Sequence, residues 1–214
     1  MVDLGTAREL WLNDTGRSGT ASGAFDALVS RYREPHRQYH GVAHVRRVLA
    51  DVNGLMRAVV VSDPAAVRLA AWYHDAIYEP RSSTNEQDSA DLADRELAEV
   101  GISDDRRREV ARLILLTAGH VALDPAVDPA GAVLLDADLA VLSAEPAVYD
   151  AYVNGVRSEY QHVDDAAWRS GRAGVLHRFL DAARIYSTAT MSAREPRARA
   201  NLTAELATLH ELPG

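Results

Sequence analysis

The apolar residues of this sequence recur with a helical period along almost the whole chain. The longest stretch with strand character is only three residues long, Val59 to Val61, which is too short for a buried strand. Neither an internal repeat nor a low-complexity tract interrupts the helical pattern. We therefore predict an all-α fold, a single-domain bundle of roughly eight to ten helices that spans residues 1–214.

Two adjacent side chains that can bind a metal end the apolar helical run at residues 69–78. Counting back from His74 at helical spacing reaches Ala70 and Val67, so the imidazole continues the buried face of this helix. A buried imidazole needs a carbonyl or carboxylate as partner, or a metal ion. The His74-Asp75 pair alone leaves these alternatives open.

Asp138 is a further polar residue that packing does not explain. Apolar residues lie one helical turn before it, at 134–135, and one turn after it, at 141–142. Burying an unpaired carboxylate costs on the order of several kcal/mol, so a cation or strong hydrogen-bond donors should face Asp138. Asp136 falls on the opposite side of the same helix, and we expect it to be solvated.

His44 borders the amphipathic face of the helix that we predict from residue 44 to near Val61. Taken alone, His44 is explained as a histidine at the edge of the core that hydrogen-bonds to a nearby group. Taken with the other residues, it gives the order His44, His74-Asp75, Asp138, each member on a separate predicted helix and facing inward.

This order resembles the HD superfamily of metal-dependent phosphohydrolases. The surrounding segments are similar to one group of small, largely uncharacterised bacterial HD proteins. These segments are residues 32–40, Asn85-Glu86 with Ser89-Ala90, residues 135–139, 157–160 and 200–202. Gly41 departs from the group, in which we expect asparagine, and this bears on substrate contact and leaves the metal ligands untouched.

The resemblance implies an HD-type helical bundle that holds one divalent ion, which would be Mn, Fe, Co, Ni, Zn or Mg. The expected ligands are His44, His74, Asp75 and Asp138. It further implies attack of metal-bound hydroxide on a phosphate ester of a small molecule, with a nucleotide as the expected class. Asp75 would also orient the water, and Glu86 would accept or relay a proton. The expected substrate contacts are Arg37, His40, Asn85 and His120.

Several of these residues also have simpler explanations. Arg37 and His40 would otherwise pair only with surface carboxylates. A first-turn glutamate such as Glu86 commonly does no more than complement the helix dipole. His120 would be a further metal ligand, a substrate contact, or a cation at a helix C-terminus. Arg157, Glu159 and Arg172 lie on later helices that look like scaffold. Either they reach the cavity or, as most charged helical residues are, they are solvated.

Two other functions share the predicted scaffold. A non-catalytic module that senses a nucleotide would keep the fold, although it would have no need of the acidic ligands. An HD-type iron oxygenase needs additional histidines between His74 and Asp138, where the sequence offers only His120. A site with one metal ion is therefore favoured.

The composition excludes some kinds of catalysis and some kinds of binding partner. The chain has no cysteine, and all 23 of its basic residues are arginine, so thiolate and Schiff-base chemistry are excluded. A net charge of -8 argues against binding of a nucleic-acid duplex and favours a small phosphorylated substrate. The N-terminal residues lack the features of a signal peptide, and no apolar stretch approaches about 18 residues. We predict a cytoplasmic protein without membrane contact, and because small cytosolic enzymes often pair, a homodimer is the expected assembly.

Overall fold

The structure is a computed structural model in which residues 2–211 are described. In this range the chain forms eleven α-helices, one 3₁₀ helix (η1) and no strand, which confirms the all-α prediction. The count exceeds the predicted eight to ten because α10 is a single turn of four residues. The elements in chain order are α1 (Leu4–Thr15), α2 (Gly19–Arg31), α3 (Val42–Leu55), α4 (Pro64–Tyr73), α5 (Asn85–Glu99), α6 (Asp104–Leu116), α7 (Pro129–Asp138), η1 (Leu139–Ser143), α8 (Pro146–Glu159), α9 (Asp165–Asp181), α10 (Ala189–Ser192) and α11 (Glu195–Glu211).

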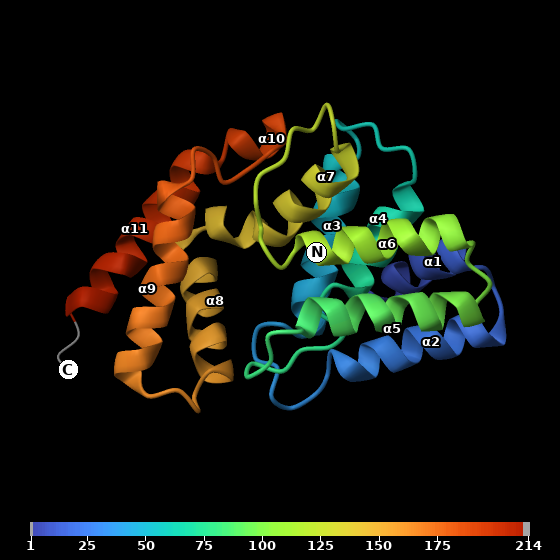
Figure 1. Cartoon of the computed structure of the whole chain (residues 1–214), viewed down its shortest axis with the longest axis horizontal. Helices are drawn as coiled ribbons and strands as arrows, with labels where there is room; N and C mark the ends of the chain where they lie inside the picture. The colour runs from blue at the N-terminus through green and yellow to red at the C-terminus, as the bar shows by residue number, and fades with distance from the viewer. Residues whose placement is uncertain (1, 212–214) are drawn as a thin grey trace.

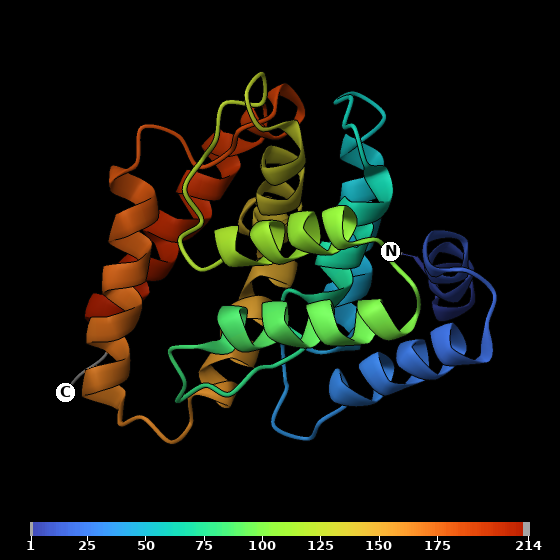
Figure 2. The same ribbon diagram turned by 45° about the vertical axis from the view of Figure 1, so that its right-hand side comes forward.

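Two groups of helices lie side by side. In the first group α5 packs along α6, α4 packs against α6 and α7, and α3 packs against α4 and α7. In the second group α9 packs on α11, while η1 contacts both α8 and α11. Figures 1 and 2 show α5 and α6 crossing the front of the first group, with α9 and α11 on the left of the molecule. The chain passes from one group to the other through α7 and η1.

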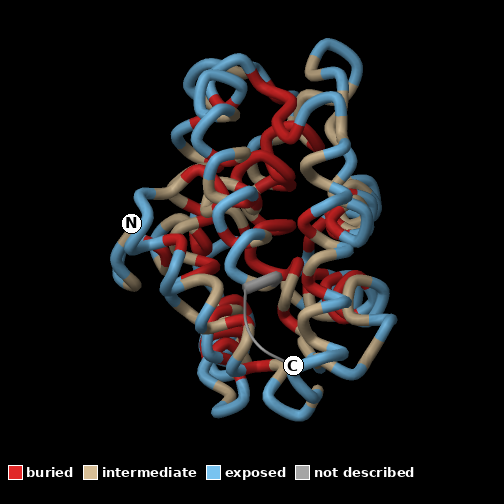
Figure 3. Tube along the Cα trace, turned by 90° about the vertical axis from the view of Figure 1, so that its left-hand side faces the viewer, coloured by how far each residue is buried: buried red, intermediate tan, exposed pale blue. Residues whose placement is uncertain are grey.

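An aromatic cluster in the first group holds α4 in place. The ring of Trp11 lies 6.2 Å from Trp72 and 6.0 Å from Tyr73, and Phe25 lies 5.2 Å from Trp72. Figure 3 shows the buried segments at the centre of the trace and the exposed ones around them. Because Trp72 and Tyr73 directly precede His74, packing of these rings fixes the end of α4 at the candidate site.

Local sequence signals explain where several helices begin. Asp63 accepts a hydrogen bond from the Ala66 N–H, and Pro64 is the first residue of α4. A capping aspartate followed by proline is a sequence signal for the start of a helix. Glu86 lies in the first turn of α5, as expected, and Thr84 at the N-cap makes no side-chain hydrogen bond to the helix backbone. The Thr84 hydroxyl donates to the Asp88 carboxylate instead of capping the helix backbone.

The predicted bounds of α3 lay too far toward the C-terminus at both ends. The helix ends at Leu55 and not near Val61, and Val60 is 90% exposed in the turn that follows. At the other end the helix begins at Val42, so His40 precedes it and does not share a helical face with His44. A Cβ atom at Gly41 would lie 3.1 Å from the Tyr32 carbonyl oxygen, and this close approach favours glycine at the start of α3.

Among residues 2–211, no helix combines the length and the apolar character that a bilayer crossing requires.

Candidate metal centre

Four side chains from three helices meet at the centre of the first group. His44 comes from α3, His74 and Asp75 follow the end of α4, and Asp138 is the last residue of α7. The Nε2 atoms of His44 and His74 are 3.1 Å apart, and Asp75 Oδ2 lies 3.3 and 3.1 Å from them. Asp138 Oδ1 lies 3.2 and 3.4 Å from the same two nitrogens. The four residues that the sequence predicted as ligands therefore lie together.

The donor set of this cluster fits a cation. His74 Nδ1 lies 3.0 Å from the Ala71 carbonyl oxygen, which can only accept, so in the neutral imidazole Nδ1 carries the proton. Its Nε2 lone pair then faces the carboxylate oxygens of Asp75 and Asp138, which are also acceptors. Acceptors that converge in this way repel one another unless positive charge lies among them. Two imidazole nitrogens and two carboxylates are ordinary ligands of divalent transition metals.

The pKa values of the cluster reflect the same demand for positive charge. Burial alone would lower the pKa of His74, but the nearby carboxylates of Asp75 and Asp138 outweigh it and hold this pKa well above its usual value. Burial would raise the pKa of both carboxyls, yet the imidazoles hold them well below their ordinary values. Either protons on the imidazoles or a divalent ion would supply the positive charge that the cluster needs, and in both cases the carboxylates are ionised.

His120 contacts the second oxygen of Asp138. Its Nε2 lies 2.7 Å from Asp138 Oδ2. Its backbone φ of 46° lies in the left-handed region, which residues other than glycine rarely adopt. A strained backbone at a candidate site is held by its surroundings, and here it directs the imidazole at a carboxylate of the candidate metal centre. The structure thus places His120 as the partner of Asp138, and its predicted contact with substrate stays a prediction.

A cavity of about 390 Å³ opens beside these residues. His44, Asp75 and Asp138 line one side of it, together with His120. The other wall comes from α8 and α9 and is mainly apolar and aromatic. Its residues include Tyr152, Val156, Tyr160, Val175 and Phe179. The candidate metal centre therefore faces a space large enough for a small organic ligand.

No family model, curated protein or solved structure matches this chain. The resemblance to the HD superfamily therefore depends on the sequence segments quoted above. Any function has to be argued from the geometry of the site.

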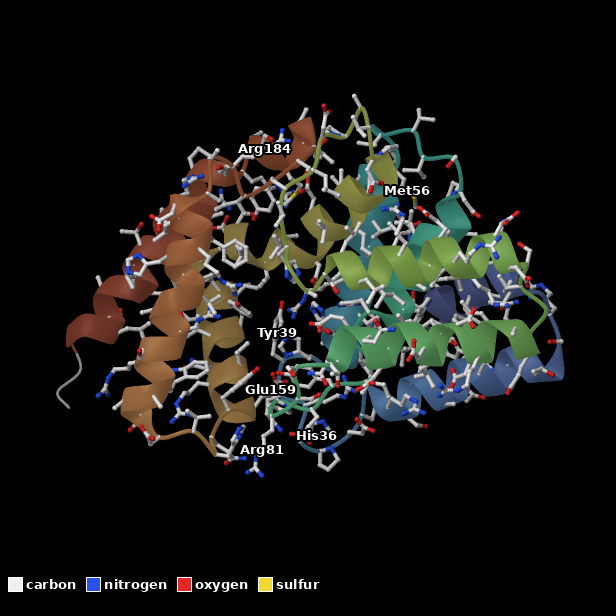
Figure 4. All side chains as sticks on the ribbon, viewed as in Figure 1. His36, Tyr39, Met56, Arg81, Glu159 and Arg184 are labelled. Carbon is white, nitrogen blue, oxygen red and sulfur yellow. The ribbon has the colours of Figure 1, made fainter. Side chains whose placement is uncertain are left out.

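A buried glutamate holds His40 at the cavity wall. Glu159 Oε1 accepts the backbone N–H groups of residues 38, 39 and 40 at 2.7 to 2.9 Å, and Oε2 lies 2.6 Å from His40 Nδ1. The Tyr78 hydroxyl donates to the same Oε2 at 2.9 Å. Burial raises the pKa of Glu159, but the bonds from His40 and the backbone outweigh it and lower the pKa to about 2. Figure 4 shows Glu159 and Tyr39 between the two groups of helices.

The alternative that Glu159 is solvated was wrong, because it is only 5% exposed. A signal was present, since Glu159 follows buried Val156 by three residues and so borders the inward face of α8. Of the two alternatives for Arg172, the cavity is the one that the structure supports: Arg172 lines it and is buried in an ion pair with Glu205, with Nε–Oε1 at 2.7 Å.

Arg37 does not line the cavity, and its predicted contact with substrate stays a prediction. Its side chain is buried, and its Nη1 donates to the carbonyl oxygens of Asp75 and His40 at 2.7 and 3.1 Å. Nη2 donates to the Ala76 carbonyl at 3.0 Å, and Nε pairs with Glu34 at 3.0 Å. Arg37 instead holds the backbone just after α4, where Asp75 lies.

Asn85 and Glu86 line the cavity as the sequence predicted, but they differ in what their side chains do. The Asn85 amide bonds to both backbone groups of Glu79: Oδ1 accepts from its N–H and Nδ2 donates to its carbonyl, each at 3.0 Å. Asn85 therefore closes the loop 79–85. The Glu86 carboxylate has no hydrogen bond or ion pair with any described residue, so it is open to the cavity.

Asp136 was expected in solvent, and this was wrong as well. It is 1% exposed, and its two oxygens accept the N–H groups of Ser187 and Thr188 at 2.8 and 2.7 Å. Burial raises its pKa even though these bonds oppose the shift. The segment before α10 covers this face of α7, so the helix is buried on both sides.

Proposed function

We propose that this protein is a metal-dependent phosphohydrolase that cleaves a phosphate ester of a small molecule. The observation that carries the proposal is the convergence of two imidazole Nε2 atoms and two carboxylates at the wall of a cavity. His44, His74, Asp75 and Asp138 would hold one divalent ion. Such an ion lowers the pKa of a coordinated water and neutralises charge on a phosphoryl oxygen.

Other residues at the cavity would accept a proton, contact the phosphate and hold a metal ligand in position. Glu86 is open to the cavity and is placed to accept a proton from a water molecule there. His40 is oriented by Glu159 through Nδ1, and in its protonated form it would donate its Nε2–H to a phosphate oxygen. His120 holds Asp138 in position through Oδ2. A module that binds a nucleotide without turnover would use the same site, so release of phosphate is the distinguishing observation.

The test is metal analysis of the purified protein, followed by assay of phosphate release from nucleotides and simple phosphate esters with Mn, Fe, Co, Ni, Zn and Mg. We expect His74→Ala to lose bound metal and to lower turnover about 100-fold or more. His177→Ala is the matched control, because His177 is exposed on α9 and lies outside the cavity. Wild-type protein that binds metal but releases phosphate from no ester refutes hydrolysis, and unchanged turnover in Asp75→Ala refutes the site.

A further inference from the structure

A second cavity, of about 350 Å³, lies between α8 and α9. Aliphatic and aromatic side chains make up most of its wall. They include Val156, Tyr160, Val163, Trp168 and Val175, with Gly171 at one edge. We call this cavity the α8–α9 cleft.

The α8–α9 cleft shares part of its wall with the cavity beside the candidate metal centre. Val156, Tyr160, Arg172 and Val175 line both spaces. Among the described residues that line the cleft, Arg172 is the one with a charge, and its guanidinium is paired with buried Glu205 at 2.7 and 3.0 Å. A molecule whose charged end lies near Asp75 and Asp138 therefore has an apolar space within its reach.

We propose that the α8–α9 cleft binds an apolar, hydrocarbon part of the substrate's leaving group. The substrate would then be a phosphate monoester of an apolar alcohol, with its phosphate at the candidate metal centre. This inference rests on the proposed function for the position of the phosphate. It replaces the nucleotide that the sequence led us to expect.

The polar groups of the cleft favour a hydrocarbon over a nucleobase. A base carries several N–H and carbonyl groups on its edge, and each one that is buried without a partner disfavours binding. Tyr160 and Trp168 offer one hydroxyl and one N–H, and the Arg172 guanidinium is already engaged by Glu205. A hydrocarbon needs none of these partners.

The size of the cleft fits a ring or a chain of several carbons. A cavity of about 150 Å³ holds benzene in an apolar protein interior, and the cleft is larger. Each methylene that leaves water strengthens binding about fourfold. Lengthening an alkyl chain by a few carbons is therefore a sensitive probe.

Two glycines of α9 provide a matched pair of variants. Gly171 and Gly174 are both exposed, and a Cβ atom added at either one would meet no atom within 4 Å. Only Gly171 lines the cleft. Gly171→Leu should fill the cleft, Gly174→Leu should not, and both changes raise helix propensity.

The experiment measures binding of methylphosphonate and hexylphosphonate to the manganese-loaded protein by calorimetry and by tryptophan fluorescence. The phosphonate C–P bond is not hydrolysed, so binding is read without turnover. Trp168 lines the cleft, whereas Trp11 and Trp72 are buried in the core, so the fluorescence change should disappear in Trp168→Phe. We expect hexylphosphonate to bind more than about tenfold more tightly than methylphosphonate in the wild type and in Gly174→Leu. In Gly171→Leu the two affinities should agree to within about twofold.

Equal affinities in the wild type, no binding of either phosphonate, or tighter binding of a nucleoside monophosphate than of hexylphosphonate would overturn the proposal. So would an unchanged hexyl preference in a folded Gly171→Leu protein. If that variant does not fold, Ala167→Leu, which lines the cleft one turn earlier, takes its place. A hexyl preference without phosphate release from any ester would reject hydrolysis and leave the cleft assignment standing.

Discussion

The molecule buries two clusters of histidine and carboxylate, and they are satisfied in different ways. Around Glu159 the carboxylate accepts three backbone N–H groups, a tyrosine hydroxyl and the Nδ1 of His40. In the cluster around His44 and His74, the carboxylates of Asp75 and Asp138 both lie against the two imidazole Nε2 atoms. No backbone N–H donates to either carboxylate among the described contacts. The Glu159 carboxylate is satisfied mainly by neutral donors of the protein, whereas the Asp75 and Asp138 carboxylates need positive charge, which imidazolium protons or a divalent ion would supply.

The largest effect on metal affinity should come from removing one negative charge of the cluster around His44 and His74. Asp138→Asn keeps the size of the side chain but lowers the negative charge that attracts a divalent ion. We expect metal affinity to fall about 100-fold or more, measured by titration of metal-free protein. Asp150→Asn is the control, because Asp150 is exposed on α8 away from the cavity. Equal losses in both variants would erase the distinction between the clusters.

The stability that the Glu159 cluster contributes should depend on pH in the acid range. The fold lowers the Glu159 pKa from 4.5 to about 2, so its contribution to stability is complete above about pH 4.5 and is lost as pH falls toward 2. That contribution is about 3 kcal/mol in the free energy of unfolding. Denaturant unfolding between pH 5 and about pH 2 should show this loss in the wild type but not in Glu159→Gln. Parallel curves for the two proteins would show that the glutamate is not held as an anion.

Metal removal should destabilise only one of the two clusters. An ion that binds the folded state at about 100 times its dissociation constant adds about 2.7 kcal/mol to stability. Addition of a chelator should therefore lower the Tm of wild-type protein and of Glu159→Gln by similar amounts. It should have no effect on Asp138→Asn, and a chelator effect of equal size in that variant would place the ion elsewhere.

His120 should have a smaller influence on the metal than the ligands themselves. His120→Asn tolerates the left-handed backbone but shortens the side chain that reaches Asp138 Oδ2. Residues that orient a ligand typically change metal affinity 10- to 100-fold, and we expect the lower end of about tenfold. His177→Asn should have no effect. A loss as large as that in Asp138→Asn would make His120 a ligand.

The smallest effect concerns the loop that covers the cavity. Asn85→Ala removes two hydrogen bonds to the Glu79 backbone and should destabilise the protein by about 1 kcal/mol, measured by thermal unfolding. Because the amide is engaged by the loop, metal affinity should stay within about twofold of the wild type. A large rise in KM with unchanged Tm would instead restore Asn85 as a substrate contact.

The sequence by itself determined the helical class, the start of α4 at Asp63-Pro64, and the inward position of His44, His74 and Asp138. These features depend on local caps and on helical periodicity, both of which involve residues a few positions apart. Only the tertiary structure decided the environments of Glu159 and Asp136. The backbone donors of Glu159 lie 119 to 121 positions away, and those of Asp136 lie 51 and 52 positions away.

Arg37 follows the same rule, because the carbonyls of residues 75 and 76 that engage it lie 38 and 39 positions along the chain. A polar side chain at the border of an apolar face is solvated or bound according to which distant backbone groups the fold brings to it. Periodicity carries no information about those groups.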